Sequence, residues 1–466
     1  MTGRLVVVSN RIPTDAEPSG GLMVALHDCL RETGGMWVGA APDTVDVPSK
    51  ALTQIGAGDY RRLTFEITKD EHEEFYLGYC NSVLWPLFHR RSDLIAYSAA
   101  QATAYAKVNA RVARLLRHDL TPDDRIWIHD YHFLPLGLEL RRLGVCNPIG
   151  FFLHTPFPLR ADLPALPQHR EFLGWLSAYD LVGLQSERDV AACLEMFRAD
   201  PETEVMANGR LRRADGEVAV ASFPIGIDAA EFAAKARDNA IGDDLALTPG
   251  QKLMIGVDRL DYSKGLVERF RGFEAFLDNQ EPADTCVTFL QIAQVSRSDV
   301  AAYQDIRAEL EVAAGRINGR HGALDWTPIR YLSQGVPRER VAGLMRRADA
   351  CLVTPLADGM NLVSKEFVAA QDPEDPGVLI LSHFAGAAEQ MTEALIVNPY
   401  NTDEIARAIR TALAMPQDER RDRHARLLDV IGSRDIVWWT KAYLDRLSEV
   451  SMPRMPHVGG QLSAAS

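Results

Sequence analysis

The most informative set of polar side chains is the segment Asp358–Leu362, which follows a short apolar run and opens a stretch of helical periodicity. Backbone N–H groups at the start of a helix lack partners within the helix and can bind an anion, while a carboxylate beside them can accept hydrogen bonds from sugar hydroxyls. Glu366 lies eight residues after Asp358, about two helical turns further on, where a carboxylate could hold a ribose diol. The alternative interpretation is a capped helix followed by a surface acid.

A second set combines two cations. Arg259 and Lys264 lie five residues apart, around a turn that follows the apolar run Leu253–Val257. Fixed cations at such a place suit a diphosphate leaving group, because its negative charge grows during group transfer. The alternative is a solvated cluster in which an arginine pairs with a nearby aspartate. Arg297, after the next apolar run, could bind a phosphate or pair with Asp299.

Three further motifs lie in the first half of the chain. Asp130 follows an apolar run and could accept a hydrogen bond from a sugar hydroxyl or act as a base, or could merely cap a loop. His154 follows another run and is flanked by prolines; a histidine in such a place is more often a structural hydrogen-bonding group than a catalyst. Gly20 and Gly21 precede a helical stretch and could let backbone N–H groups approach an anion, although a surface turn is the simpler interpretation.

Composition limits the possible partners of these residues. The chain has 466 residues, of which 47% are hydrophobic and 24% charged, and its formal net charge is −14. This is ordinary globular composition, with an acidic balance that would repel nucleic acid and most anionic membrane surfaces. Asp-x-Asp, which many metal-dependent sugar-nucleotide transferases use to hold a divalent ion, is absent from the sequence. We therefore expect no nucleic-acid partner, no membrane association, no cofactor and no metal, with any phosphate held by local arginine and lysine.

Cysteine spacing and hydropathy indicate a cellular location. The six cysteines lie far apart and lack the spacing of a zinc site, which favours reduced thiols. The first apolar run, Leu5–Val8, is too short for the core of a signal peptide, and no stretch approaches the roughly 20 apolar residues of a membrane span. We expect a cytoplasmic protein.

The elements that must position these motifs form the same pattern twice. Short aliphatic runs alternate with longer stretches of helical periodicity, which is typical of an open parallel sheet with crossover helices. The expected strands are Leu5–Val8, Ile126–Ile128, Ile149–Leu153, Leu181–Leu184, Leu253–Val257, Val287–Ile292, Ala350–Val353 and Val378–Leu381, and the expected helices include Ala99–Leu116, Leu134–Leu143, Val300–Ala314 and Ile405–Ala414. Ligands of such sheets bind beyond the carboxyl ends of the strands, where the motifs above are placed.

The fold class is therefore α/β, with two doubly wound Rossmann-like domains facing a central cleft. Pro and Gly residues punctuate the segment Ser222–Asp228, which makes it the best candidate for a hinge. We place an N-terminal domain at 1–228, a C-terminal domain at 229–451 and a disordered tail at 452–466.

Six motifs in order resemble the trehalose-6-phosphate synthases, retaining glycosyltransferases that join the glucose of a nucleoside diphosphate sugar to glucose 6-phosphate. The motifs are Ser9–Arg11, Asn81–Pro86, Trp127–His132, Gly150–Pro158, Arg259–Leu266 and Thr354–Leu362. The resemblance runs from Arg4 to about Leu447. It implies a GT-B fold, metal-independent transfer from a donor such as UDP-glucose, and a closing C-terminal helix near Ile436–Leu447 that packs back on the first domain.

The resemblance also implies a role for each matching residue. The donor would be bound by Gly21, Arg259, Lys264, Asp358, Gly359, Met360, Asn361, Leu362 and Glu366 in the C-terminal domain and the loop after the first strand. The acceptor, glucose 6-phosphate, would be bound by Arg11, Tyr76, Trp85, Asp130 and Arg297. The residues implied in catalysis are Asp130, His154, Arg259 and Lys264, and no residue is a metal ligand.

Two departures from the family pattern lie on the acceptor side. The loop after Arg11 is short, and Trp37–Pro42 stands where family members often have Trp-x-Gly-Trp-Ser-Gly. Two alternatives therefore stay open: a sister transferase that uses another phosphorylated acceptor, such as glycerol 3-phosphate, and a sugar-phosphate sensor without catalytic activity. The sequence does not indicate the nucleobase of the donor, and it leaves open whether the chain forms a homo-oligomer.

Overall fold

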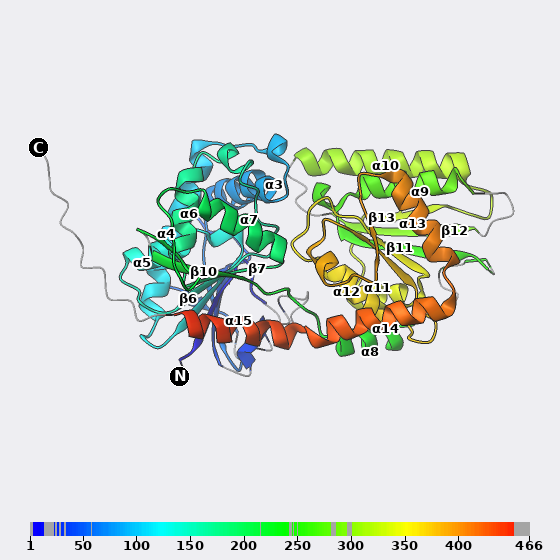
Figure 1. Ribbon diagram of the computed structural model, residues 1–466. Coiled ribbons are helices and arrows are strands. Elements are labelled where there is room, and N and C mark those ends of the chain that lie inside the picture. The colour runs from blue at the N-terminus through cyan, green and yellow to red at the C-terminus, as the bar shows by residue number, and fades with distance from the viewer. Residues whose placement is uncertain are drawn as a thin grey trace, which may run out of the picture. The chain divides into compact units, whose positions relative to one another are not determined.

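The chain folds into two compact units. The computed structural model describes residues 3–13, 23, 26–27, 29–31, 34–56, 58–214, 216–241, 245, 247–248, 250–280, 286–295 and 301–451 (Figure 1). Unit 1 contains the described residues up to Phe223 together with the chain from Thr440 onward, and unit 2 is Pro224–Trp439. The chain thus passes into unit 2 five residues before the expected boundary at Asp228, and it returns to unit 1 within a helix. The expected tail 452–466 lies outside the described residues.

Unit 1 is built on a ten-stranded sheet with the strand order β3-β4-β2-β1-β5-β6-β7-β10-β9-β8. The strands are β1 (Leu5–Val8), β2 (Gly35–Ala40), β3 (Thr53–Gln54), β4 (Arg61–Phe65), β5 (Arg125–His129), β6 (Ile149–Phe152), β7 (Leu181–Leu184), β8 (Glu204–Val205), β9 (Leu211–Arg213) and β10 (Gly216–Ser222). The strands from β4 to β10 in this order pair in parallel, and the remaining pairs at both edges are antiparallel. The central strands β1, β6 and β7 are buried along their whole length.

The helices of unit 1 connect these strands and include one of an unusual type. They are α2 (Lys69–Glu71), the π-helix η1 (His72–Leu84), α3 (Trp85–Phe88), α4 (Ala99–Asp119), α5 (Leu136–Arg142), α6 (His169–Ser177) and α7 (Glu187–Arg198), with short 3₁₀ turns η2 (Ser92–Leu94), η3 (Tyr131–Phe133) and η4 (Leu163–Ala165). Ser98 and Thr68 start α4 and α2 as capping boxes. A π-helix of 13 residues is uncommon, and such segments frequently occur at functional sites.

Unit 2 is built on a six-stranded parallel sheet with the order β13-β12-β11-β14-β15-β16. The strands are β11 (Lys252–Arg259), β12 (Val287–Gln294), β13 (Ile329–Leu332), β14 (Ala350–Val353), β15 (Val378–Ser382) and β16 (Leu395–Val397). The helices are α8 (Ala229–Asp238), η6 (Tyr262–Lys264), α9 (Leu266–Leu277), α10 (Ala301–His321), α11 (Arg338–Arg347), α12 (Leu362–Ala370), η7 (Gly386–Glu389), α13 (Thr402–Ala414) and α14 (Gln417–Ser433), and α15 (Ile436–Val450) runs on into unit 1.

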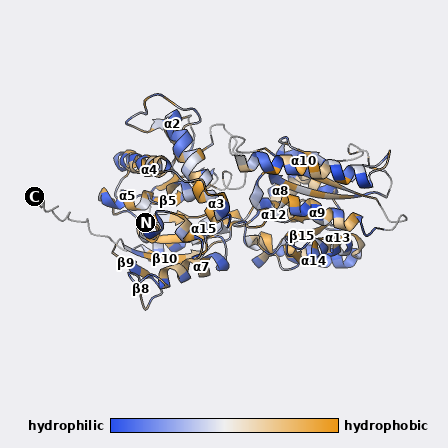
Figure 2. Cartoon of the chain, turned by 90° about the horizontal axis from the view of Figure 1, so that it is seen from above, coloured by the Kyte–Doolittle hydropathy of each residue, from blue (hydrophilic) through white to orange (hydrophobic). Residues whose placement is uncertain are grey.

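The helices of unit 2 form two groups, one on each face of its sheet. Helices α9, α10 and α13 pack together, and α8, α11, α12 and α14 pack together on the opposite face (Figure 1). Figure 2 shows hydrophilic and hydrophobic residues alternating along α10. Its buried residues Tyr303, Ile306, Leu310 and Ile317 recur at helical spacing, so one stripe of the helix faces the core. Within the described residues, no helix is long and apolar enough to cross a membrane.

Every strand and helix that was expected by its range is present in the structure. Most boundaries differ by a few residues, but α10 continues to His321, beyond the expected end at Ala314. The strands that the periodicity did not predict include β2, β4, β10 and β13. β4, β10 and β13 mix polar and apolar residues, as in Arg61–Phe65, while β2 contains two glycines, and β13 is only partly buried. Both β2 and β4 are stabilised by a neighbour on each side: β2 pairs in parallel with β1 and β4, and β4 pairs in parallel with β2 and antiparallel with β3. This pairing depends on the fold rather than on their own sequences.

Helix α15 is anchored in unit 1 by one tyrosine. The ring of Tyr443 stacks on Trp127 of β5, with centroids 4.5 Å apart and an interplanar angle of 11°. Gly150 and Gly183, on the neighbouring strands, leave the space for it, since a Cβ atom at either position would lie within 2.6 Å of the tyrosine side chain. The Tyr443 hydroxyl donates to the carbonyl oxygen of Phe151 at 3.1 Å. The part of α15 around Tyr443 is therefore held in unit 1 by packing as well as by a hydrogen bond.

We predict that Tyr443→Ala destabilises unit 1 by about 3–5 kcal/mol, because a buried aromatic side chain is lost over strands that cannot close the cavity. The measurement is urea unfolding followed by tryptophan fluorescence. Lys441→Ala is the matched control, since that side chain lies on the same helix and is 78% exposed. Equal unfolding midpoints for Tyr443→Ala and Lys441→Ala would contradict the proposed anchor.

Candidate functional site

An ion pair joins two of the predicted motifs of unit 2 at the carboxyl ends of adjacent strands. Lys264, in the turn after β11, places its Nζ atom 2.6 Å from Oδ2 of Asp358, which follows β14. Asn361 Nδ2 donates to the same oxygen at 3.0 Å. Both partners of the ion pair are largely buried, with side chains 12% and 13% exposed. The pair is therefore shielded from solvent, which strengthens its electrostatic interaction.

A buried arginine, Arg269, supports the turn that carries Lys264. Arg269 is fully buried and donates to Asp258 at 2.6 Å, to Thr354 Oγ1 at 2.9 Å and to Gln291 Oε1 at 2.9 Å. It also contacts the carbonyl oxygen of Lys264 at 3.4 Å. Burial raises the pKa of Asp258, while the charges of Arg269 and Lys264 oppose this shift. The network ties β11, β12 and the chain after β14 together, so the turn that carries Lys264 has a fixed position.

The segment Asp358–Leu362 lies against η7 and leads into α12. Gly386 N donates to the carbonyl oxygen of Asp358 at 3.1 Å, and Ala387 N donates to that of Met360 at 2.9 Å. Gly359 and Met360 are buried by these contacts. Leu362, the first residue of α12, is half-buried.

Helix α12 begins later than the sequence suggested. Asn361, not Asp358, is its N-cap residue: its Oδ1 atom accepts from Ser364 N at 3.0 Å, and its backbone has the left-handed φ of 80°. The expectation that Asp358 and Glu366 share a helical face two turns apart is wrong, because Asp358 lies outside the helix. Asparagine tolerates the left-handed conformation better than most residues, which explains its presence at this bend.

Glu366 and Arg259 occupy different surroundings in unit 2. Arg338 Nη2 donates to Oε1 of Glu366 at 3.3 Å. Burial raises the pKa of Glu366, and the charge of Arg338 lowers it. Arg259 is the last residue of β11 and is exposed. Exposure at the carboxyl edge of the sheet leaves this guanidinium accessible to a ligand.

In unit 1 the predicted acceptor residues Arg11, Tyr76 and Trp85 lie in the chain after β1, in η1 and at the start of α3. Arg11 Nη2 donates to the hydroxyl of Tyr76 at 3.3 Å. The Tyr76 ring stacks on His132, with centroids 5.9 Å apart and an angle of 13°. Tyr131, next in the sequence, contacts the ring of Trp85 at 5.7 Å. Tyr76 and Trp85 are thus joined by aromatic contacts through His132 and Tyr131, and Arg11 is joined to Tyr76 by a hydrogen bond.

Asp130 and His154 meet at the carboxyl ends of β5 and β6. The backbone N of His154 donates to Oδ1 of Asp130 at 3.3 Å. Asp130 has a left-handed φ of 72°, and its side chain makes no capping hydrogen bond to η3, so its interpretation as a loop cap is wrong. A non-glycine residue in this conformation is strained, and such residues cluster at functional sites.

Two neighbours hold the ring of His154. Its Nε2 atom lies 3.1 Å from Nδ1 of the buried His129, and its Nδ1 atom lies 3.4 Å from Nε2 of Gln185. An amide nitrogen can only donate, so the contact with Gln185 leaves the ring proton of His154 on the side of His129. Burial lowers the pKa of His154 to about 3, and burial together with His154 lowers that of His129 well below its ordinary value. The His154 ring is therefore neutral at pH 7, and both of its nitrogens face protein groups.

Some of the predicted residues lie outside the described residues, and some important ones were not predicted. Gly21 and Arg297 belong to the first group. Arg269 and Arg338 in unit 2, and His129 and Gln185 in unit 1, belong to the second. His129 and Gln185 each lie at or just after the end of a strand, a signal that could have identified them. Arg269 and Arg338 lie in helices, and their sequences carry no comparable signal.

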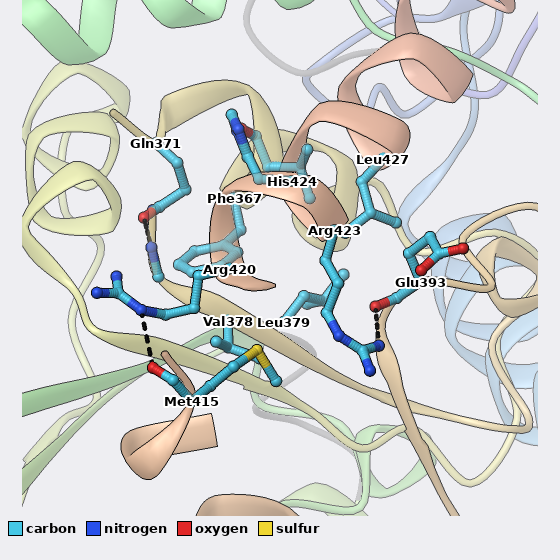
Figure 3. Close-up of a pocket in the computed structure, with 12 residues that line it drawn as sticks. Phe367, Gln371, Val378, Leu379, Glu393, Met415, Arg420, Arg423, His424 and Leu427 are labelled. Atoms are coloured by element: carbon cyan, nitrogen blue, oxygen red, sulfur yellow. Dashed lines mark hydrogen bonds between the residues drawn. The ribbon is translucent and has the colours of Figure 1, made fainter. Parts of the chain in front are cut away.

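Two cavities in the structure contain none of the predicted residues. A cavity of about 450 Å³ in unit 1 is lined by residues of η1, α4, α5 and α6, but two of its arginines are already paired with acids, Arg142 with Glu139 and Arg213 with Asp200. A cavity of about 10 Å³ in unit 2 (Figure 3), beside His424, has room for about one water molecule. Among the residues that the structure describes, no three metal-ligating side chains gather in one place.

Two doubly wound units, each with polar residues at the carboxyl edge of its sheet, define the GT-B class of glycosyltransferases. Within that class the chain belongs to glycosyltransferase family 20, whose family model matches residues 5–449. The family model thus covers almost all of both units.

Individual proteins are similar to this chain over nearly its full length. A trehalose-6-phosphate synthase of Klebsiella pneumoniae is 45% identical over 455 residues, 96% of each chain. An E. coli protein solved bound with UDP-2-fluoro glucose is 44% identical, with a TM-score of 0.92 over 97% of this chain and 100% of that one. A UDP-forming α,α-trehalose-phosphate synthase from Burkholderia xenovorans, solved in complex with glucose-6-phosphate, is 42% identical, with a TM-score of 0.90 over 96% and 100%.

The neutral His154 leads to a prediction about pH. Its native pKa of about 3 lies below the value of about 6.5 in the unfolded chain, so the unfolded state binds a proton first and stability falls as the pH drops below 6.5. At pH 5 this costs about 2 kcal/mol. We expect His154→Gln to reduce the loss of unfolding free energy between pH 7.5 and pH 5 by about this amount, as measured by urea unfolding.

The control for this experiment is His118→Gln, on the exposed end of α4. Equal losses of stability in wild type and His154→Gln between the two pH values would show that folding does not lower the pKa of His154, contrary to this prediction.

Proposed function

We infer that this protein transfers glucose from UDP-glucose to glucose 6-phosphate with retention of configuration, forming α,α-trehalose 6-phosphate and UDP. The observation that carries this function is the similarity over 97% of the chain to a structure bound with UDP-2-fluoro glucose. Family membership over residues 5–449 and the curated relatives agree with it.

We propose that unit 2 binds the donor through the residues around the Lys264–Asp358 ion pair. Lys264 and Arg259 would hold the diphosphate, whose charge grows as the glycosidic bond breaks. Asp358, beside Lys264, would accept hydrogen bonds from glucose hydroxyls, and the start of α12 at Leu362 would direct N–H groups to the phosphates. Glu366, held by Arg338, would bind the ribose diol. Lys264 and Asp358 lie 2.6 Å apart, so the diphosphate and the glucose of the sugar nucleotide would be bound side by side.

The remaining donor contacts are proposed from the same resemblance. Gly359, Met360 and Asn361 would present the backbone of the donor loop to the sugar and phosphates. Gly21, in the N-terminal half of the chain, would approach the diphosphate.

We propose that residues of the N-terminal half of the chain, together with Arg297 of the C-terminal half, bind the acceptor. Arg11, Tyr76 and Arg297 would bind the phosphate of glucose 6-phosphate, and Trp85 and Asp130 would shape the sugar pocket. The hydrogen bond between Arg11 and Tyr76 supports a shared anion site. His154 would contact the transferred glucose through a ring that is neutral and fixed by two neighbours.

Retention in this proposal arises by attack on the front face of the sugar. The leaving phosphate takes the proton of the acceptor hydroxyl, so no enzyme nucleophile is required. The reaction needs neither a metal nor another cofactor, and we place the protein in the cytoplasm.

The direct test is incubation of purified protein with UDP-glucose and glucose 6-phosphate. We expect UDP release together with a disaccharide phosphate whose two anomeric protons both show α coupling in NMR spectra, at a rate unchanged by EDTA. GDP-glucose and ADP-glucose form the donor panel, and glycerol 3-phosphate tests the sister-transferase alternative. Absence of product with all three donors would refute the function, and binding without turnover would favour a sensor.

Two substitutions should separate donor chemistry from acceptor binding. Lys264→Ala should lower kcat about 100- to 1,000-fold, because its contact strengthens as charge develops in the transition state. Arg297→Ala should raise the KM for glucose 6-phosphate about tenfold or more at nearly constant kcat, because a charge-assisted hydrogen bond to the bound substrate is lost.

Lys252→Ala is the control for both variants, since Lys252 starts β11 at the end opposite to Arg259 and pairs with Asp349. Similar changes in kcat and KM for Lys264→Ala and Arg297→Ala would argue against these separate roles. Steady-state kinetics with either substrate varied make the distinction.

A further inference from the structure

Unit 2 contains a buried lysine that the proposed reaction does not use. Lys365 lies on α12, next to Glu366, and is only 1% exposed. Its Nζ atom donates to the carbonyl oxygen of Ile225 at 2.8 Å and to Oε1 of Gln390 at 3.0 Å. Among the described residues it makes no ion pair with a carboxylate. Burial, and then the charge of Arg434, lowers its pKa to about 7. An ammonium group buried without a counterion is unfavourable for stability, so a role in the folded protein should account for it.

One acceptor of Lys365 belongs to the place where the chain enters unit 2. Ile225 is the second residue of unit 2. Its neighbour Gly226 packs against Arg434 and Asp435, which lie shortly before the chain leaves unit 2 after Trp439. A Cβ atom on Gly226 would lie 2.3 Å from the carbonyl oxygen of Arg434 and 2.4 Å from the carbonyl carbon of Asp435. Asp435 Oδ1 accepts from Trp438 N at 2.7 Å at the start of α15. The entering and leaving segments of the chain therefore lie side by side within unit 2, and Lys365 holds the first of them.

The other acceptor belongs to the support of the proposed donor loop. Gln390 follows η7, the turn whose N–H groups bond to Asp358 and Met360. A Cβ atom on Gly386 in that turn would lie 1.8 Å from the carbonyl oxygen of Gly359, so turn and loop are in backbone contact. The Nε2 atom of Gln390 is buried and has no hydrogen-bond partner among the described residues. Within the described structure, Lys365 is thus the group that orients this amide.

We propose that Lys365 is a positioning residue whose ammonium group couples the donor loop Asp358–Leu362 to the two segments through which the chain enters and leaves unit 2. It contacts no substrate in the proposed reaction; it acts through Gln390 and η7 on one side and through Ile225 on the other. The kinetic part of this inference rests on the proposed function, in which the donor loop Asp358–Leu362 holds UDP-glucose while its glucose is transferred. Misplacement of reacting groups by about 1 Å can lower a rate about 100-fold, so a fixed connection between loop and chain segments contributes to catalysis.

The test compares Lys365→Met with wild type, because methionine keeps a long apolar side chain and loses the donors. We expect kcat for glucose transfer to fall at least tenfold, while the dissociation constant of UDP, measured by calorimetry, changes less than threefold. Hydrogen exchange, measured by mass spectrometry without substrate, should become faster in peptides covering 223–228, 386–391 and 434–439. A merely structural lysine would alter stability without this selective pattern.

A second variant approaches the same coupling from the other side. Gly226→Ala places a Cβ atom against the carbonyl oxygen of Arg434 and leaves Lys365 intact, so it should lower kcat and speed exchange at 223–228 and 434–439. If Lys365→Met does not fold, Gly226→Ala provides the test of the proposed coupling. Lys252→Met is the matched control: this lysine of the same unit is 43% exposed and pairs with Asp349, and its substitution should leave kcat and the exchange of the three peptides unchanged.

Two results would overturn the proposal. One is an unchanged exchange rate at both chain segments in Lys365→Met and Gly226→Ala. The other is the same pattern of changes in Lys252→Met as in Lys365→Met. The exchange experiment needs no substrate, so it tests the coupling even if the wild-type protein transfers no glucose. Absence of glucose transfer by the wild-type protein would refute the proposed function and leave the coupling to be decided by exchange.

Discussion

The candidate donor site depends on one ion pair, between Lys264 and Asp358, at the carboxyl ends of β11 and β14. Its geometry is set by residues that do not belong to the pair. Arg269 fixes the backbone of the lysine turn from inside the unit, and Asn361 holds the carboxylate from the start of α12. A cation and an acid held this closely in a protected place can bind a phosphate and a sugar hydroxyl side by side, which is what a sugar nucleotide requires.

The candidate site of unit 1 is built from aromatic side chains rather than from an ion pair. The rings of Tyr76, His132, Tyr131 and Trp85 follow one another in contact. Aromatic side chains have few rotatable bonds and keep their geometry at small entropic cost. The π-helix η1 brings Tyr76 to this chain of rings, and Trp85 follows directly after it. Rigid walls with few charged groups suit a neutral sugar ring, while Arg11 at the edge supplies charge for a phosphate.

Local patterns were sufficient for much of the architecture. The buried strands, such as Leu181–Leu184, are continuous apolar runs, and burial on both faces of a parallel sheet requires such runs. The strands that were not predicted contain polar residues or, in β2, glycines, and they depend on pairing with their neighbours. For the candidate site, the sequence identified Lys264 and Asp358 but not Arg269, because a charged residue in a helix is usually exposed and only the folded chain shows that this one is buried.

The sequence by itself determined the α/β class, the position of most elements and the chemistry of the motifs, because periodicity and residue type act locally. Only the tertiary structure decided which of these residues meet. Lys264 and Asp358 are 94 positions apart, and Lys365 reaches a carbonyl group 140 positions away. Such contacts follow from the order of strands in the sheet and from the path of the chain between the units, and neither is encoded in the spacing of residues along the chain.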